Sequence, residues 1–286
     1  YGIPDFKMEK NLIDRREDQM KKEGVIFKTG VNVGVDLPIK ALKKKFDAIL
    51  LTIGSEEARD LKIPGREAHG IYSAMDFLPL QNQAVSGEIS NQQLKVNAKN
   101  KNVVVIGGGD TGSDCIGTSF RQGAKKVFCA YRRDEYNMPG SKREVKNSKE
   151  EGIDFLWNMQ PIEIIGDKKV EGVKFIKTKL QKTDIRGREI PVPIEGSETI
   201  IKADRVIMAF GFRPNPPAWL TKNKVKIDDI GRVIINIKSD YSHQTDNPKI
   251  FAGGDMVRGS DLVVTAVFEG RNAAKGIIDY INDNHK

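Results

Sequence analysis

The sequence predicts an α/β protein built around a parallel sheet, and three observations point to this fold class. Residues 102–131 show the order strand, glycine loop, helix, strand, which is a βαβ unit. The continuous apolar runs at 48–51 and 206–210 are typical of strands buried on both faces of a parallel sheet. A length of 286 residues suffices for one large domain or two ordinary ones, each with its own core.

Composition excludes several classes of protein. Two cysteines are too few for a disulfide framework or an iron–sulfur cluster, and their scarcity suits a reducing, cytoplasmic location. No apolar run approaches the roughly 20 residues of a membrane-spanning helix, so no membrane partner is expected. The net charge of +8 is spread along the chain and aromatic residues make up only 7%. An ordinary solvated surface is therefore favoured over a nucleic-acid groove.

The first hundred residues contain two periodic stretches separated by polar segments. A charged amphipathic pattern over residues 9–22 predicts a helix, and the apolar residues 25–27 predict a short strand after it. Residues 46–54 predict a buried strand that ends in a glycine. Residues 80–100 are rich in Asn, Gln and Ser and predict a loop or a loosely packed surface helix.

The second half of the chain repeats the pattern of strand and glycine. Residues 153–202 predict short strands with a polar turn at 183–188. The strand expected at 206–211 ends in a glycine, like the strand at 49–54, so the chain is expected to leave one domain after the first of these glycines and to re-enter it after the second. Residues 250–280 predict a strand, a glycine junction and an apolar helix.

The glycine loop of the βαβ unit satisfies G-x-G-x-x-G between a strand and a helix. In this pattern Gly107 permits the tight turn, Gly109 lets a pyrophosphate approach the backbone, and Gly112 lets the helix pack close to the strand. The helix N-terminus supplies N–H donors to the phosphates. The residues expected at the dinucleotide are Gly107, Gly108, Gly109, Asp110, Thr111 and Gly112. The alternative is a glycine-rich turn that binds nothing.

Two arginines follow the second strand of this unit. An enzyme that selects NAD places a carboxylate at such a position to bind the ribose 2′-hydroxyl, whereas this chain has Arg132 and Arg133. Guanidinium groups bind the 2′-phosphate of NADP through charge-assisted bonds, so NADP(H) is the expected nucleotide. A solvated strand end is the alternative for this pair, and it is the favoured interpretation for the nearby Lys142 and Arg143.

A second strand-to-helix junction lies at Gly254-Asp255. Its aspartate is suited to accept hydrogen bonds from the ribityl chain of a flavin. The following helix, which begins near Val264, Thr265 and Ala266, is suited to direct N–H groups at the flavin pyrimidine. A helix N-cap without a ligand explains the same residues, and spacing leaves both interpretations open.

The remaining candidates for chemistry are isolated residues. His69, His243 and His285 have no ligand-spaced carboxylate or cysteine, so no metal site is expected. Cys115 and Cys129 fall inside a helix and a strand and are expected in the core, and Ser113 lacks a nucleophile motif. The sequence therefore predicts no catalytic side chain.

Several stretches together resemble the NADPH domain of the glutamate synthase small (β) subunit family. These stretches are residues 2–7, 136–145, 151–158 and 251–255, and the resemblance extends over nearly all of the chain. Related modules, such as the N-terminal half of dihydropyrimidine dehydrogenase, share the architecture.

The resemblance implies a Rossmann-like flavoprotein with two dinucleotide-binding domains. An NADPH domain at 55–212 is expected as an insertion in an FAD domain formed by 1–54 and 213–286. The residues implied to hold NADPH are Gly107, Gly109, Gly112, Arg132 and Arg133, and those implied to meet the flavin are Gly254, Asp255, Val264, Thr265 and Ala266.

The resemblance also implies a reaction and a partner. Family members pass a hydride from NADPH to FAD and then single electrons through iron–sulfur clusters to a large subunit, which forms glutamate from glutamine and 2-oxoglutarate. This chain begins at Tyr1 and lacks the family's cysteine-rich segment and first flavin-binding unit. We therefore expect an N-terminally truncated chain with an incomplete FAD domain. The alternative is an NADP-binding docking fragment without turnover by itself.

Overall fold

The computed structural model describes residues 1–182 and 189–284, so the polar turn expected at 183–188 lies outside the described residues. The chain forms two compact units. The first unit comprises Tyr1–Met20 and Asp60–Gly211, and the second comprises Lys21–Arg59 and Phe212–Lys286. This division differs from the expected one at two places: residues 1–20 were expected with residues 21–54 but belong to the first unit, and residues 55–59 and 212 were expected in the NADPH domain but belong to the second unit.

The N-terminal arm, residues 1–8, is fixed to the first unit by specific contacts. The Asn82 side-chain amide donates to the carbonyls of Tyr1 and Ile3 at 2.5 and 2.9 Å. The Arg121 guanidinium stacks 4.0 Å from the centroid of the Phe6 ring. These contacts join segments that are far apart in the sequence. The local sequence pattern does not reveal them, so it placed the arm in the other unit.

The first unit is built on a five-stranded, wholly parallel sheet. Its strands, in spatial order, are β3 (Ile71–Ser73), β11 (Arg205–Met208), β4 (Asn102–Ile106), β5 (Lys126–Tyr131) and β6 (Asp154–Trp157). The strands predicted at 102–106 and 127–131 are thus confirmed, and both lie centrally.

Strand β4 shows why the sequence of a central strand in this sheet is a continuous apolar run. Val103 and Val105 belong to the core cluster that also holds residues of helices α3 (Ala74–Val85), α4 (Asp110–Arg121) and α5 (Lys142–Glu150). Val104 and Ile106 face the other way, into a cluster formed with the antiparallel strands. Since successive side chains alternate between faces, a strand covered on both sides needs apolar residues throughout.

The antiparallel sheet consists of β7 (Met159–Ile165), β8 (Gly172–Lys182), β9 (Glu189–Pro193) and β10 (Thr199–Lys202). Strand β8 is central and pairs with each of the other three. Its fully buried Val173 and Phe175 provide the apolar contacts to the parallel sheet.

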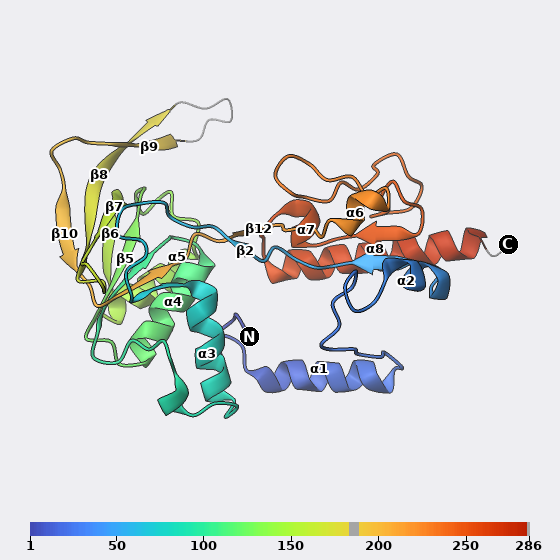
Figure 1. Ribbon diagram of the computed structural model, residues 1–286, viewed down its shortest axis with the longest axis horizontal. Coiled ribbons are helices and arrows are strands. Elements are labelled where there is room, and N and C mark those ends of the chain that lie inside the picture. The colour runs from blue at the N-terminus through green and yellow to red at the C-terminus, as the bar shows by residue number, and fades with distance from the viewer. Residues whose placement is uncertain (183–188, 285–286) are drawn as a thin grey trace. The chain divides into compact units, whose positions relative to one another are not determined.

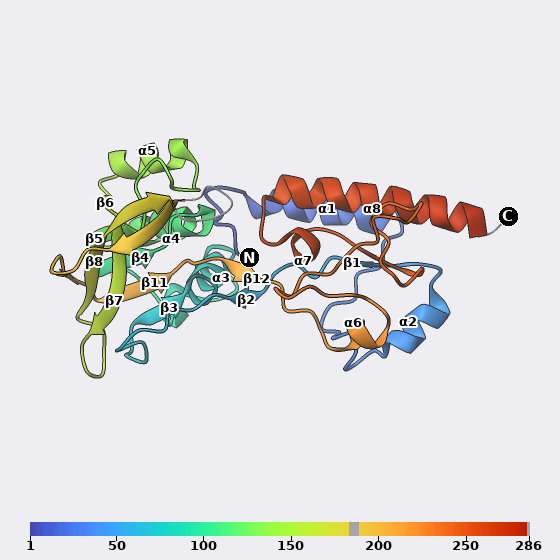
Figure 2. The same cartoon turned by 90° about the horizontal axis from the view of Figure 1, so that it is seen from above.

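The second unit is organised around the parallel pair β1 (Ile49–Leu51) and β13 (Ile250–Ala252). An antiparallel ribbon pairs β2 (Glu57–Ala58) with β12 (Phe212–Arg213). Its helices are α2 (Ile39–Lys45), α6 (Trp219–Lys222), α7 (Asp255–Arg258) and the long α8 (Val263–Asn284). Figures 1 and 2 both show α7 directly beside the first part of α8.

Two predicted elements near the N-terminus have different outcomes. The helix expected at 9–22 is confirmed as α1 (Lys10–Lys22). The strand expected at 25–27 is wrong, because no strand of the described chain pairs with these residues and Ile26 is 82% exposed. Within residues 80–100, the chain completes α3 and forms a short 3-10 helix, η1 (Asn91–Gln93).

Candidate functional site

The glycine loop lies at the carboxyl edge of the parallel sheet, between β4 and α4. Strand β4 sits between β5 and β11, so chain order reverses beside it, and open α/β sheets bind ligands at such a reversal. The loop is anchored on both sides, because the Gly107 N–H donates to the Ala130 carbonyl at 3.0 Å and the Ala209 N–H donates to the Ile106 carbonyl at 2.9 Å.

Three positions of the loop are glycine, each for a different structural reason. Gly107 has φ +142°, and a Cβ there would overlap the Ala209 carbonyl oxygen. A Cβ on Gly112 would lie 2.7 Å from the Gly107 carbonyl oxygen, so this glycine permits the close approach of α4. A Cβ on Gly109 would meet nothing within 4 Å. The space beside Gly109 is therefore open, as a site for a backbone-bound pyrophosphate requires.

Helix α4 starts without a side-chain cap. Gly109 occupies the N-cap position, and no side chain of residues 1–182 or 189–284 accepts a hydrogen bond there. Thr111 is half-buried and Asp110 is exposed in this first turn. Uncapped N–H groups at a helix N-terminus bind anions, and the helix dipole adds partial positive charge.

Gly108 connects the loop to the chain after β5. A Cβ on Gly108 would meet the Tyr131 ring at 2.6 Å, and its carbonyl accepts from the Gly140 N–H at 2.9 Å. The Tyr131 hydroxyl donates to the Asn137 carbonyl at 2.9 Å. Burial raises the pKa of Tyr131, and the adjacent Arg133 and Arg132 act in the opposite direction.

The two arginines at the end of β5 are held by their backbone. The Arg132 carbonyl accepts from the Thr178 hydroxyl at 2.8 Å, and the Arg133 carbonyl accepts from the Asn158 N–H at 2.9 Å. Arg132 is exposed, whereas Arg133 is half-buried and its Nε has no hydrogen-bond partner among the described residues. A buried guanidinium donor without an acceptor fits an anionic ligand that is bound at this strand end.

The structure adds an ion cluster next to the loop that sequence reasoning missed. The Lys7 ammonium lies 2.6 Å from Asp114 on α4 and 2.8 Å from Glu144 on α5. Burial raises the pKa of Asp114 despite this partner. Burial would lower the pKa of Lys7, but its hydrogen bonds to both carboxylates raise it overall. No sequence signal links residue 7 to residue 114, because the contact is purely tertiary.

The second junction, between β13 and α7, is stabilised by a buried carboxylate. Gly254 has φ +76°, and its N–H donates to Glu269 Oε2 at 2.7 Å. The same carboxylate binds Arg258 through Nε at 2.8 Å and is only 6% exposed. Sequence reasoning missed Glu269, although it is the first charged residue after the apolar start of α8, at residues 263–268.

The predicted flavin residues come together at this junction. A Cβ on Gly254 would lie 3.8 Å from Ala266 Cβ, so the start of α7 and the first turns of α8 are adjacent. Asp255 is half-buried, and burial raises its pKa. A hydrogen bond from the Asp261 backbone acts in the opposite direction, and the charges of Asp261 and Glu269 add to the rise. Thr265 and Ala266 are half-buried, whereas Val264 is 71% exposed.

The other predicted residues give no further site. His243 Nδ1 lies 3.0 Å from the Ala252 carbonyl, and His285 lies outside the described residues. Cys115 and Cys129 are buried, and burial raises the pKa of Cys129 to about 12. The part of the chain that the structure describes holds no cluster of three or more metal-ligating side chains.

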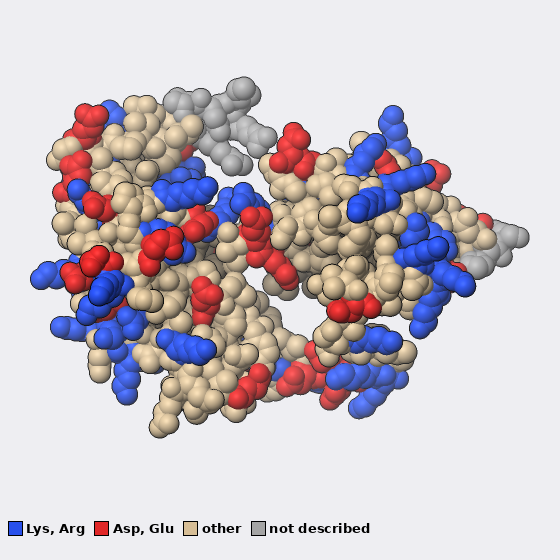
Figure 3. Space-filling view, viewed as in Figure 1, with Lys and Arg blue, Asp and Glu red and all other residues tan. Residues whose placement is uncertain are grey.

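The surface carries charges of both signs. Figure 3 shows Lys and Arg side chains interspersed with Asp and Glu over the first unit. Lys142 and Arg143 are exposed on the first turn of α5, and the Lys142 ammonium lies 5.6 Å from the Tyr136 ring centroid. None of the described helices combines the length and apolar character needed to cross a membrane.

Comparisons with known proteins agree with this architecture. The family model described as pyridine nucleotide-disulphide oxidoreductase matches residues 38–270. The glutamate synthase [NADPH] small chains of Halomonas elongata and Escherichia coli are 46% and 48% identical over 99% and 98% of this chain. The putative oxidoreductase AegA of Escherichia coli is 47% identical over 98%. This chain spans 60% of each small chain and 43% of AegA.

Solved structures show the same fold at low sequence identity. Mycobacterium tuberculosis FprA in complex with NADPH superposes with a TM-score of 0.74 and 18% identity, over 98% of this chain and 74% of FprA. Thioredoxin reductase from T. acidophilum gives a TM-score of 0.60 and 24% identity, over 82% of this chain and 66% of its own. The predicted fold class and the resemblance to glutamate synthase small chains are confirmed.

Proposed function

The chain belongs to the pyridine nucleotide-disulphide oxidoreductase family, and from this premise we propose that it is the NADPH-oxidising part of a flavoprotein. The first unit binds NADPH and the second unit binds FAD. The relatives of 46–48% identity that are named for NADPH support the choice of nucleotide. Because the chain spans only 60% of these relatives, the activity of the whole protein is part of the proposal.

The observation that carries the proposal is the arrangement at the carboxyl edge of the parallel sheet. The open side of Gly109 and the uncapped N-terminus of α4 suit a pyrophosphate. Arg132 and the unpartnered Nε of Arg133 stand at the end of the next strand, where they suit the 2′-phosphate. The backbone bonds from Thr178 and Asn158 fix this strand end before any ligand arrives.

The second unit supplies groups that fit a flavin. Asp255, at the start of α7, offers a carboxylate to ligand hydroxyls, and the first turn of α8, at Val264, presents the positive end of the helix dipole. In that turn the N–H groups of Thr265 and Ala266 already donate to the Leu262 carbonyl at 3.0 and 3.2 Å. Glu269 holds the Gly254 N–H and so orients the junction between the two helices. When both cofactors are bound, NADPH supplies a hydride that the flavin accepts. The chain's own residues bind and orient, and no acid–base side chain is assigned.

The further path of the electrons follows the relatives' names. We propose that iron–sulfur clusters held outside this chain receive the electrons, since both cysteines are buried within the first unit. The proposed final partner is a glutamate synthase large subunit that makes glutamate from glutamine and 2-oxoglutarate. A module like those of AegA or dihydropyrimidine dehydrogenase, with another acceptor, is the alternative.

The test is a titration with NADPH and NADH, with and without added FAD, following flavin absorbance. We expect NADPH to bind more tightly than NADH and to bleach the bound flavin. Arg132→Ala should weaken NADPH about tenfold or more and leave NADH nearly unchanged, because only NADPH carries the 2′-phosphate. Equal weakening of both nucleotides would contradict the role of Arg132. A protein that binds NADPH but never takes up FAD would instead favour the docking fragment without turnover.

A further inference from the structure

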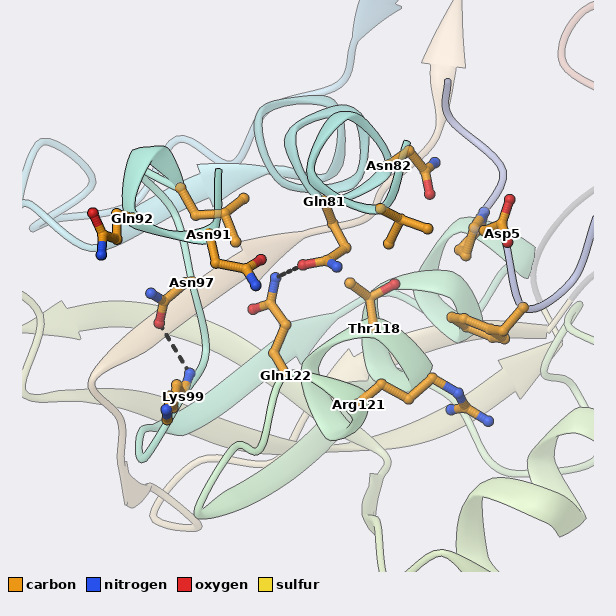
Figure 4. Close-up of a pocket in the computed structure, with 14 residues that line it drawn as sticks. Asp5, Gln81, Asn82, Asn91, Gln92, Asn97, Lys99, Thr118, Arg121 and Gln122 are labelled. Atoms are coloured by element: carbon orange, nitrogen blue, oxygen red, sulfur yellow. Dashed lines mark hydrogen bonds between the residues drawn. The ribbon is translucent and has the colours of Figure 1, made fainter. Parts of the chain in front are cut away.

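A pocket with a mixed polar and apolar lining lies in the first unit, away from the glycine loop. It is enclosed by α3, the second half of α4, the N-terminal arm and residues 91–99, and its volume is about 720 Å³ (Figure 4). This size falls in the usual range of small-molecule sites, which is roughly 300–1,000 Å³. The nucleotide is expected at the N-terminus of α4, so its phosphates do not fill this pocket.

Carboxamide side chains dominate the lining. They are Gln81, Asn82, Asn91, Gln92, Asn97 and Gln122. Part of this set is fixed in advance, since Gln122 donates to Gln81 Oε1 at 2.5 Å and accepts from the Ala98 N–H at 2.7 Å. Each carboxamide offers both donors and acceptors, which is the complement of another amide.

One buried hydroxyl in the lining has no partner. Thr118 is 2% exposed, and its Oγ1 makes no hydrogen bond to any described residue. Its neighbour Ser119 is equally buried but donates to the Cys115 carbonyl at 2.7 Å. Buried polar groups are normally paired, and an unpaired one destabilises the protein that contains it. The Thr118 hydroxyl therefore calls for an occupant with a polar group at this point.

The two ends of the pocket carry opposite charges. Figure 4 places Lys99 at one end and Asp5 at the other. Lys99 forms no ion pair with any described residue. Asp5 Oδ1 accepts from the Lys10 backbone N–H at 3.3 Å and lies 3.9 Å from the Lys10 ammonium, so Oδ2 is the oxygen left for a ligand. Arg121, also in the lining, is already paired with Glu151 at 3.1 Å. The Lys99 ammonium and one oxygen of the Asp5 carboxylate thus remain for a ligand.

We propose that this pocket binds a small zwitterion that carries carboxamide or peptide groups. Lys99 receives its carboxylate, Asp5 receives its ammonium group, and the carboxamides together with Thr118 receive its amides. Short peptides have this chemistry, and their charged termini are far enough apart to reach both ends of the pocket, whereas the two charges of a free amino acid lie on one carbon. The proposal stands apart from the nucleotide site and does not depend on the proposed function.

The experiment is calorimetric titration of the chain with trialanine, with L-glutamine as the comparison probe. We expect trialanine to saturate a single site and L-glutamine not to do so, because its ammonium and carboxylate groups lie on the same carbon. N-acetylation of trialanine removes the ammonium charge and should weaken binding about tenfold or more. Thr118→Val should weaken it by a similar factor. If trialanine does not bind up to about 10 mM, if L-glutamine binds equally well, or if Thr118→Val binds trialanine as the unaltered chain does, the proposal is overturned.

A matched pair of variants separates binding from folding. Thr118→Val should leave the melting temperature of the ligand-free chain unchanged or raise it, because it removes an unsatisfied group. Ser119→Ala, one residue along the same helix, should lower it by about 2–4 °C and leave probe binding intact. A loss of stability in Thr118→Val as large as that in Ser119→Ala would show that the hydroxyl is satisfied within the protein, and would overturn the argument.

Discussion

Both candidate sites place a glycine junction between the carboxyl end of a parallel strand and a helix, yet their surroundings differ. In the first unit, β4 is the central strand of five and is buried on both faces. In the second, β13 pairs with β1 alone among the described strands. The first site is shaped by backbone packing, whereas the second depends on a side chain, Glu269, that fixes the Gly254 N–H.

This difference predicts where each site is most easily broken. At Gly107 the backbone packing leaves no room for an added Cβ, whereas the junction held by Glu269 is sensitive to loss of that residue's charge. Each unit contains one tryptophan, Trp157 in β6 and Trp219 in α6. Replacing either with phenylalanine leaves a fluorescence signal that reports the unfolding of one unit alone.

The largest effect is expected from Gly107→Ala. The new Cβ overlaps the Ala209 carbonyl and the residue must keep a positive φ, so β4 and β11 cannot retain their spacing. The free energy of unfolding, followed by Trp157 in urea, should fall by about 3 kcal/mol or more.

Gly109→Ala is the matched control, because its Cβ enters open space at φ −92°. Its unfolding free energy should change by less than about 1 kcal/mol, while the Kd for NADPH rises about 100-fold. A Gly109→Ala chain that binds NADPH normally would show that no phosphate approaches this position.

The next effect is expected from Glu269→Gln in the second unit. The amide keeps one acceptor but loses the charge that binds Arg258 and the Gly254 N–H. Unfolding followed by Trp219 should lose about 2 kcal/mol, and NADPH affinity in the first unit should not change. Asp261→Asn removes the other, more exposed partner of Arg258 at 3.7 Å and should cost less than about 0.5 kcal/mol. Equal losses of unfolding free energy in the two variants would contradict the role of Glu269 in holding this junction.

An effect that is absent at neutral pH and grows only in alkali is expected from the buried thiols of the first unit. Burial raises the pKa of Cys129 to about 12 and that of Cys115 well above its usual value. The unfolded thiols lose their protons near pH 8.5 and the folded ones do not, so the unfolded state binds fewer protons above that pH. Stability is therefore complete below about pH 8.5 and falls by about 1.4 kcal/mol per pH unit per thiol until the folded pKa is reached.

Urea unfolding from pH 8 to pH 11, followed by Trp157, measures this slope. Cys129→Ala should be less stable at pH 8 but should show a shallower alkaline decline. An unchanged slope in this variant would mean that other groups cause the decline.

The sequence predicted the elements whose signals are local. The strand–loop–helix around Gly107 follows from an apolar run, three glycines and a helix period, and all three signals lie within about 20 residues. The strand expected at residues 25–27 failed, because an apolar run becomes a strand only when another strand pairs with it. The cofactor contacts of Arg132 and Asp255 remain predictions.

The site residues that sequence reasoning missed act over long separations. Lys7 meets Asp114, and Asn82 holds the carbonyl of Tyr1, through contacts that no local pattern encodes. Glu269 is different, since the sequence shows it as the first charged residue after the apolar start of α8, but its target at Gly254 is visible only in three dimensions.

The smallest effect, and the sharpest test of the second site, is expected from Asp255→Asn. Burial raises the pKa of this carboxyl, so its ionised form is less favourable in the folded chain than in the unfolded one. Below the ordinary pKa of about 3.9 both states are protonated and the variant should match the unaltered chain. As pH rises through the folded pKa, the ionised aspartate costs stability that asparagine does not. At pH 7 the variant should therefore be more stable by less than about 1 kcal/mol, since Asp255 is partly exposed.

Flavin affinity should fall in the same variant, because the carboxylate is the stronger acceptor for ligand hydroxyls. A variant that is less stable at pH 7 would mean that Asp255 serves the fold as a helix cap, whereas higher stability with weaker flavin binding is the signature of a residue kept for its ligand.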